Sequence, residues 1–225
     1  MNDTISLPRH RDLPSTLWLA AFVVSGVAYM ALRDIVPQYS GWILKVLPIL
    51  LLLQQVLTKA HGVPRLLLGL GLVFSAAGDI LLSLDGLFLP GLGAFLLAQL
   101  TYTALFLTQF RWQAARLPWT AVIVAYALAC SVFVLPETGD LRWVVTAYMI
   151  AISLMALSAG FRDDHQFLWV AVGALVFMVS DTLIAVNGFI VPFALADTAI
   201  MATYYLAQAL IVLGVIRHYL ATGRH

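Results

Sequence analysis

The sequence predicts an all-α fold, a polytopic membrane bundle of eight transmembrane helices. Of its 225 residues, 62% are hydrophobic and only 10% are charged, whereas soluble domains carry about a quarter charged residues. A spanning helix needs about 20 mainly apolar residues, and the apolar runs divide the chain into eight such segments. Because all connections are short, we expect one integral membrane domain over residues 1–225.

The eight segments lie between charged residues or Pro and Gly breaks. Arg9 and Arg11 precede the first as in a signal peptide, but no small-residue cleavage site follows, so we interpret it as a retained helix. Residues 1–16 and 221–225 are predicted to be cytoplasmic ends. In chain order, we expect helices over Leu17–Leu32, Trp42–Leu57, Leu66–Leu84, Leu87–Phe110, Leu117–Leu135, Trp143–Gly160, Phe167–Val186 and Thr198–Leu220.

The basic residues predict the orientation. An even number of spans puts both termini on one side, and that side collects 9 of the 12 Lys and Arg residues, against 2 on the other and Lys45 within a span. The positive-inside rule then places both termini in the cytoplasm. The short loops favour a bacterial inner membrane.

Composition excludes several function classes. The net charge of +1, with no basic stripe, argues against nucleic-acid binding. One cysteine, Cys130, excludes an internal disulfide framework, and no histidine shares its helix to activate it. All five histidines lie in a terminus, a connection or the last helix end, which disfavours a zinc site. No cofactor is predicted, and the sequence gives no prediction of oligomeric state.

Three charged residues lie inside the spans, where each costs about 2.5–3.5 kcal/mol and usually faces a cavity or a partner. At about 1.5 Å per residue, Asp79 and Asp181 lie about 21 and 22 Å from the cytoplasmic edge. Lys45 enters from the opposite face, about 6 Å deep. All three are therefore expected in the outer third of the membrane. Lys45 could equally form a structural salt bridge or reach the interface.

Further polar residues occur at compatible depths and predict an outward-leaning polar cavity. Ser75, Asp79 and Ser83 repeat every four residues and form a polar stripe on one helix face. Each of the other residues has a structural alternative, because tyrosines anchor helices at the interface and glutamines bridge helices. The candidates are Gln99, Tyr102, Tyr148, Tyr204, Tyr205 and Gln208.

A short internal repeat is predicted between the two halves of the chain. Gly78-Asp79 in the third segment is echoed by Ser180-Asp181 in the seventh, and the Ala-Gln ending at Gln99 by the one ending at Gln208. Both copies cross in the same direction, as parallel repeats do. The symmetry would set Asp79 opposite Asp181.

Two carboxyl groups in a poorly solvated cavity can hold different protonation states, one acting as an acid and the other as a base. Such a pair suits hydrolysis in which one group protonates the substrate and the other activates water. Paired membrane aspartates with a lysine also suit proton-coupled transport of a lipid or small solute. A third alternative is a non-catalytic lipid-binding or scaffold protein in which these residues fix helix packing.

Four stretches together resemble the YhhN-like, or lysoplasmalogenase, family. They are the Gly78-Asp79 stretch, the pattern from Phe95 through Ala98-Gln99 to Tyr102, the Ser180-Asp181-Thr182 stretch followed by Asn187, and the closing Thr203-Tyr204-Tyr205-Leu206-Ala207-Gln208. Lys45-Val46-Leu47-Pro48 departs from the family pattern, in which the proline often follows the lysine directly.

The resemblance implies an eight-helix membrane hydrolase that cleaves the vinyl ether bond of lysoplasmalogens, releasing a fatty aldehyde and a glycerophospho-alcohol. Its partners would be a lysophospholipid substrate and membrane lipid. Asp79 and Asp181 are the predicted catalytic residues, with the acid and base roles unassigned. The predicted substrate-binding residues are Lys45, Gln99, Tyr102, Tyr148, Asn187, Tyr204, Tyr205 and Gln208, and no metal ligand is predicted.

Overall fold

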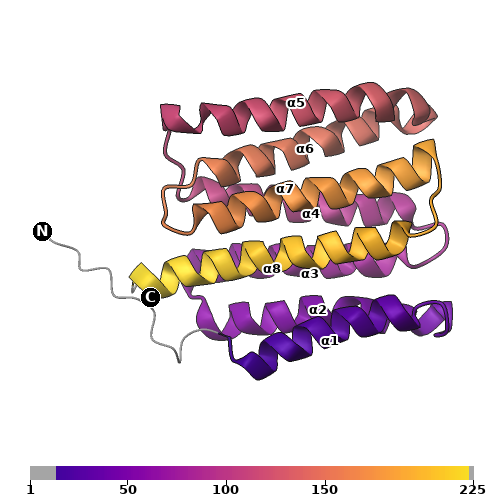
Figure 1. Cartoon of the computed structure of the whole chain (residues 1–225), viewed down its shortest axis with the longest axis horizontal. Helices are drawn as coiled ribbons and strands as arrows, with labels where there is room; N and C mark the ends of the chain where they lie inside the picture. The colour runs from indigo at the N-terminus through magenta and orange to yellow at the C-terminus, as the bar shows by residue number, and fades with distance from the viewer. Residues whose placement is uncertain (1–13, 223–225) are drawn as a thin grey trace, which may run out of the picture.

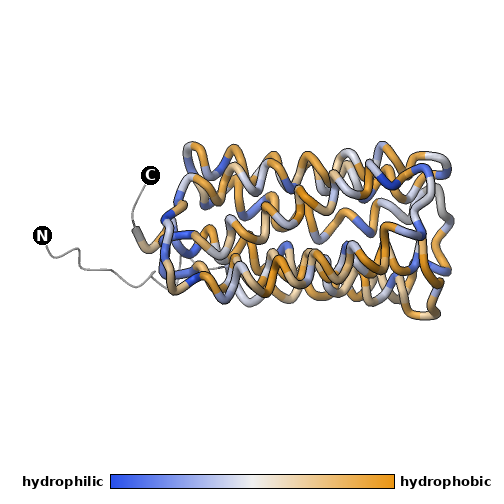
Figure 2. Tube along the Cα trace, turned by 90° about the horizontal axis from the view of Figure 1, so that it is seen from above, coloured by the Kyte–Doolittle hydropathy of each residue, from blue (hydrophilic) through white to orange (hydrophobic). Residues whose placement is uncertain are grey.

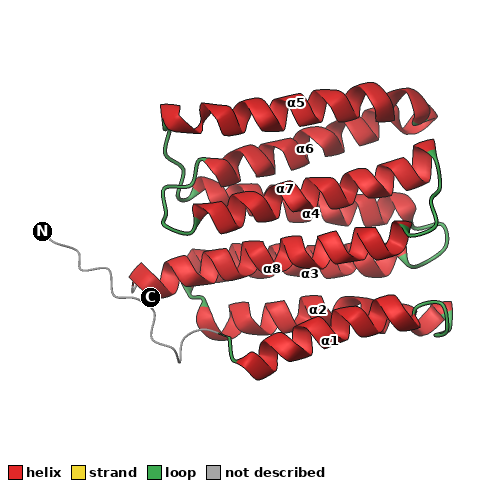
Figure 3. Ribbon diagram, in the orientation of Figure 1, coloured by secondary structure: helices red, strands yellow, loops and turns green. Residues whose placement is uncertain are grey.

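The computed structural model describes residues 14–222, and within that range it contains eight α-helices and no β-strand (Figure 3). The all-α prediction is confirmed. Residues 1–13 and 223–225, which include most of the predicted terminal segments, lie outside the described residues. The helices are α1 (Thr16–Leu32), α2 (Gln38–Lys59), α3 (Gly62–Leu82), α4 (Phe88–Leu107), α5 (Leu117–Val134), α6 (Arg142–Gly160), α7 (Phe167–Ala185) and α8 (Ala196–Thr222).

Seven of the helices in the described range are long and apolar enough to cross a membrane, and α1, with 17 residues, is slightly shorter. Figure 2 shows hydrophobic residues along the whole length of the helices. Large apolar side chains such as Leu17, Val132 and Trp143 are exposed on the outside of the bundle. Because lipid is the solvent that such a surface requires, the chain is a multi-pass integral membrane protein.

Four helices form the centre of the bundle. α3 packs most extensively against α4, and α7 against α8. α1 and α2 flank this centre on one side and α5 and α6 on the other (Figure 1). The start of α1 and the end of α8 lie at the same end of the bundle (Figure 1).

Small residues allow the central helices to approach closely, as they commonly do in membranes. A Cβ atom added at Gly173 in α7 would lie 3.0 Å from the backbone oxygen of Ala207 in α8 and 2.9 Å from the side chain of Ile211. A Cβ at Gly78 in α3 would lie 2.6 Å from the Phe95 ring of α4. Glycine therefore fixes the distance between the helices of both central pairs.

The structure differs from the predicted boundaries in two places that bear on the site. α2 begins at Gln38, four residues before the predicted Trp42, because Pro37 precedes it with a fixed φ that suits a helix start. Lys45 is therefore about 10 Å from the start of its helix. α7 continues into a π-helical turn over Val186–Ile190.

We predict that Gly173→Ala destabilises the bundle. The added methyl group has no room against the α8 backbone, and overpacking of this kind costs about 1–3 kcal/mol. The melting temperature in detergent, followed by circular dichroism, should fall.

Gly93→Ala is the matched control, because nothing lies within 4 Å of a Cβ atom added at Gly93 in α4. Its melting temperature should stay the same or rise slightly, since Ala favours helix over Gly. Equal effects of the two changes would contradict the close approach of α7 and α8.

Candidate functional site

Asp79 lies in a buried polar cluster formed by α2, α3 and α8. Its Oδ1 is 3.6 Å from Nζ of Lys45, and its Oδ2 accepts a hydrogen bond of 2.8 Å from the Tyr204 hydroxyl. Lys45 Nζ also donates to the backbone oxygen of Asp79 at 3.3 Å. The Tyr205 hydroxyl donates to the backbone oxygen of Lys45 at 2.7 Å. Lys45 thus forms a buried ion pair with Asp79.

Asp181 lies in a second cluster, formed by α4, α6 and α7. Its Oδ2 accepts a 2.5 Å hydrogen bond from the Tyr148 hydroxyl and a 3.0 Å bond from the amide nitrogen of Gln99. Both donors are neutral, and no salt bridge in the described part of the chain includes Asp181. Both bond the same oxygen, so Oδ1 remains for a ligand. Asp79 thus has a cationic partner and Asp181 has neutral partners.

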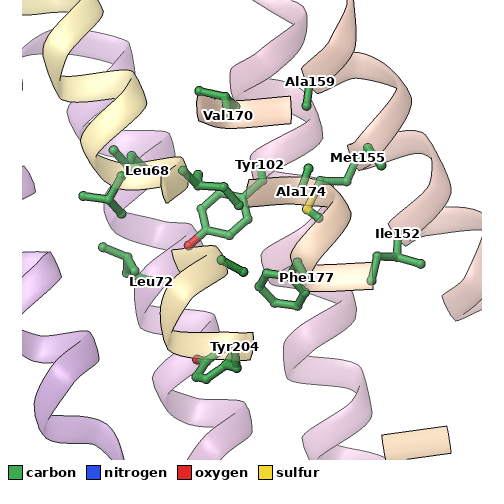
Figure 4. Close-up of a cluster of buried hydrophobic side chains, with 14 of the residues drawn as sticks. Leu68, Leu72, Tyr102, Ile152, Met155, Ala159, Val170, Ala174, Phe177 and Tyr204 are labelled. Atoms are coloured by element: carbon green, nitrogen blue, oxygen red, sulfur yellow. The ribbon is translucent and has the colours of Figure 1, made fainter. Parts of the chain in front are cut away.

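A third group of polar residues links α3, α4 and α8. The Tyr102 hydroxyl donates to the Gln208 side-chain oxygen at 2.7 Å, and the Gln208 amide nitrogen donates to the Ser75 hydroxyl at 2.9 Å. All three residues are fully buried. Figure 4 shows Tyr102 among the apolar side chains of the core. These residues bridge helices, which is the structural alternative considered for the glutamines.

Aromatic rings lie between the two aspartate clusters. Phe95 packs edge to face against Tyr204, with ring centroids 5.8 Å apart, and Phe177 does the same at 5.7 Å. Phe95 and Phe177 also contact each other, with centroids 6.4 Å apart. Figure 4 shows Phe177 and Tyr204 among the buried side chains of the core. Among the described residues no hydrogen-bond donor is shared by the two carboxylates.

Of the two aspartates, Asp181 is the one that lines a pocket in the described residues. The pocket has an empty volume of about 770 Å³, part of it open to the exterior, and lies between α4, α5, α6 and α7. Tyr148 and Phe95 line it together with Asp181. Most of the remaining lining is apolar, so this pocket differs from the polar cavity that the sequence predicted.

The ten predicted site residues therefore divide into groups. Lys45, Tyr204 and Tyr205 belong to the Asp79 cluster. Gln99 and Tyr148 belong to the Asp181 cluster. Tyr102 and Gln208 belong to the buried bridge. Asn187 is apart from all of these, since its side-chain oxygen accepts a 3.3 Å bond from the backbone N–H of Phe193 and so shapes the α7–α8 connection.

The sequence analysis did not assign four polar residues of the pocket to the site, namely Tyr126, Cys130, Ser153 and Thr182. Tyr126 donates to the Thr182 hydroxyl at 2.9 Å, and the Cys130 sulfur lies 3.7 Å from the same hydroxyl. Tyr126 and Cys130 are spaced i, i+4 on α5, and Thr182 follows Asp181. That spacing was visible in the sequence, but the direction in which α5 faces was not. The described residues contain no group of three His, Cys, Asp or Glu side chains arranged to hold a metal ion.

Comparison with known proteins agrees with the motifs noted in the sequence. Residues 40–215 match the YhhN family. The chain belongs to the YhhN family. Lysoplasmalogenase TMEM86B from Sus scrofa is 35% identical over 203 residues, which cover 88% of this chain and 86% of the relative. No solved structure matches the chain.

Two further relatives of this YhhN protein come from distant organisms. Lysoplasmalogenase TMEM86A from Homo sapiens is 32% identical over 197 residues, covering 80% of each chain. Lysoplasmalogenase from Mycobacterium tuberculosis is 34% identical over 151 residues, covering 64% of this chain and 58% of the relative. The YhhN match begins in α2 and ends in α8, so it contains both aspartate clusters and leaves α1 outside.

We predict that Lys45→Met strongly destabilises the YhhN bundle. The side chains of Lys45 and Asp79 are only 11% and 3% exposed, and leaving one charge of a buried pair uncompensated costs about 3–5 kcal/mol. The double change Lys45→Met with Asp79→Asn should recover part of the loss, because it removes both charges. Thermal unfolding in detergent measures all three proteins.

The exposed pair of Arg111 and Asp163 is the control. Its side chains are 70% and 45% exposed, and exposed pairs contribute about 0–1 kcal/mol. Arg111→Met should therefore change the melting temperature little. A loss as large as that of Lys45→Met would contradict the importance of burial.

Proposed function

We propose that this protein is a membrane-embedded ether hydrolase that cleaves the vinyl ether bond of lysoplasmalogens, a class of lysophospholipid. The observation that carries the proposal is the match to proteins named lysoplasmalogenase, which covers 88% of this chain for the Sus scrofa relative. The products are a fatty aldehyde and a glycerophospho-alcohol. An apolar pocket with a carboxyl group in its wall fits an aliphatic substrate that reacts by proton transfer.

We assign the general acid to Asp181. It lines the pocket, and both of its hydrogen-bond donors bond Oδ2, which leaves Oδ1 to carry a proton toward the substrate. A carboxyl group with neutral partners in a poorly solvated site holds a proton more readily than one beside a cation. Asp79, beside Lys45, is by the same argument the ionised member.

The reaction balances with one water molecule. Asp181 gives a proton to the vinyl carbon farther from the ether oxygen, and the adjacent carbon becomes an oxocarbenium ion. Water adds to this carbon and returns a proton to the Asp181 carboxylate. The bond from the hemiacetal carbon to the glycerol oxygen then breaks, the hydroxyl proton passes to the glycerol oxygen, and the products are the aldehyde and the alcohol.

Asp79 contributes charge to this reaction without touching the substrate. A fixed carboxylate in a region of low dielectric stabilises a nearby cation. Asp79 is therefore a positioning residue in this proposal. The sequence analysis left water activation to either aspartate, and the pocket lining favours Asp181 for it.

We also propose that the protein lies in a bacterial inner membrane with both termini in the cytoplasm and forms one integral domain. The distribution of Lys and Arg supports this orientation. The ends of α3 and α7 near Asp79 and Asp181 would then face the extracytoplasmic leaflet.

We predict that Asp181→Asn abolishes aldehyde release from a synthetic lysoplasmalogen. Loss of a general acid typically lowers the rate about 10²–10⁴-fold. Asp79→Asn should lower the rate less, because Asp79 does not line the pocket. The measurement is aldehyde formed by the purified full chain in lipid vesicles, with unfolding temperatures measured in parallel.

Asp140→Asn is the control for this experiment. Asp140 is exposed in the α5–α6 connection, so its change should leave the rate unaltered. Full turnover by a folded Asp181→Asn protein would remove that residue from the chemistry. Proton-driven solute uptake without lipid cleavage would select the transporter alternative instead.

We predict a smaller effect for Tyr148→Phe. The Tyr148 hydroxyl bonds a charged carboxylate once Asp181 has given its proton to the substrate. A hydrogen bond to a charged group contributes about 1.5–3 kcal/mol, so kcat should fall about 10–100-fold while KM changes little. Tyr126→Phe is the matched control, because Tyr126 lines the same pocket but bonds Thr182 instead of the carboxylate. Equal kcat values for the two variants would show that the short Tyr148 bond does not serve the reaction.

A further inference from the structure

The pocket that contains Asp181 continues into a groove between α5 and α6. Ala127, Met149 and Ser153 line both the pocket and the groove. Figure 1 shows α5 and α6 at one edge of the bundle. α5 is the least buried of the seven apolar spans, with 11% of its most apolar window buried. The pocket therefore reaches the side of the bundle that faces lipid.

The polar groups of the pocket lining donate their hydrogen bonds to the protein. Tyr126 donates to Thr182, and Thr182 donates to the backbone oxygen of Met178 at 2.8 Å. Ser153 donates to the backbone oxygen of Met149 at 2.7 Å. Tyr148 donates to Asp181. With these donors occupied, the lining offers a ligand mainly apolar contacts, apart from Asp181 itself.

The distances of these residues from the end of the bundle fit a lipid with its headgroup at the membrane interface and its tail toward the middle of the bilayer. α6 runs inward from Arg142, so Tyr148 is about 9 Å and Ser153 about 16 Å from that end of the bundle. Asp181 bonds Tyr148 and thus lies at the shallower level. A lipid whose ether bond reached Asp181 would have its headgroup toward the interface and its tail toward Ser153 and the middle of the bilayer.

We infer that a single alkenyl chain passes laterally between α5 and α6 and lies in this pocket, with Ala127, Met149 and Ser153 forming the passage. The occupant is the hydrocarbon chain of a one-chain lipid. The side chains at the passage determine which chains fit. This inference rests on the proposed function, because it places the substrate's tail relative to Asp181.

Photolabelling of the unmodified full chain tests the inference without catalysis. The probe is a saturated alkyl-ether lysolipid with a diazirine in its chain, which has no vinyl ether to cleave, and the vesicles are phosphatidylcholine. Cleavage after Arg116, Arg142 and Arg162 separates α5 (117–142) from α6 (143–162). We expect both fragments to be labelled, and we expect excess unlabelled saturated lysolipid to prevent this labelling. Since the vesicles supply two-chain lipid in large excess, such competition identifies a one-chain occupant.

Two variants test the passage. Ala127→Phe should lower competable labelling and reduce kcat/KM for a lysoplasmalogen at least about tenfold, the size of effect that small steric changes have in apolar pockets. Ala125→Phe is the control, because Ala125 is exposed on α5 and lines neither the pocket nor the groove. If Ala127→Phe does not fold, Ala127→Val replaces it.

The outcomes separate the inference from the proposed function. Label spread evenly over all helices and insensitive to competition would overturn the inference, even if aldehyde is released. Equal kcat/KM for the two phenylalanine variants would also overturn it. Competable labelling of 117–142 and 143–162 without any aldehyde release would support the pocket and reject the proposed reaction.

Discussion

The structure depends on the cost of placing charge in hydrocarbon, which requires that each intramembrane carboxylate find its partners within the bundle. Asp79 of α3 obtains a lysine from α2 and a tyrosine from α8. Asp181 of α7 obtains a glutamine from α4 and a tyrosine from α6. Each aspartate therefore joins three helices, and together the two clusters connect six of the eight. These polar contacts fix the positions of the helices relative to one another, which contact with lipid alone would not do.

The same constraint makes the two aspartates chemically different. A carboxylate that shares its site with an ammonium group is stabilised as an anion, whereas one surrounded by hydroxyl and amide donors has no counter-charge. Aromatic rings of Phe95, Phe177 and Tyr204 lie between them. The two aspartates expected as a symmetric pair thus differ in the structure: Asp79 forms an ion pair with Lys45, and Asp181 lines a pocket. The predicted internal repeat itself stays a prediction.

The fold was predictable because length and apolar composition leave few alternatives in a bilayer. Lys45, Asp79 and Asp181 were identifiable for a similar reason, since charged residues are rare in spans. Their pairing was not predictable, because it depends on the rotation of each helix about its axis. In α5, apolar residues lie all around the helix and do not indicate which side faces the bundle. Tyr126 and Cys130 were consequently not assigned to the site, and the assignment of Asn187 to substrate binding stays a prediction. The apolar pattern also did not predict the early start of α2, because that start depends on Pro37.

The π-helical turn over Val186–Ile190 has a consequence for the outer rim of the pocket. Phe189 lies on this turn and meets Phe88, at the start of α4, with ring centroids 6.1 Å apart. A π turn holds more residues per revolution than an α-helix. It therefore changes the direction, around the helix axis, in which the residues after it point. The aperture above Asp181 is consequently set by backbone pitch as well as by side-chain bulk. Loss of one residue from this turn would rotate Phe189 away from Phe88 and leave the carboxyl group under a wider opening, without altering any group that bonds it.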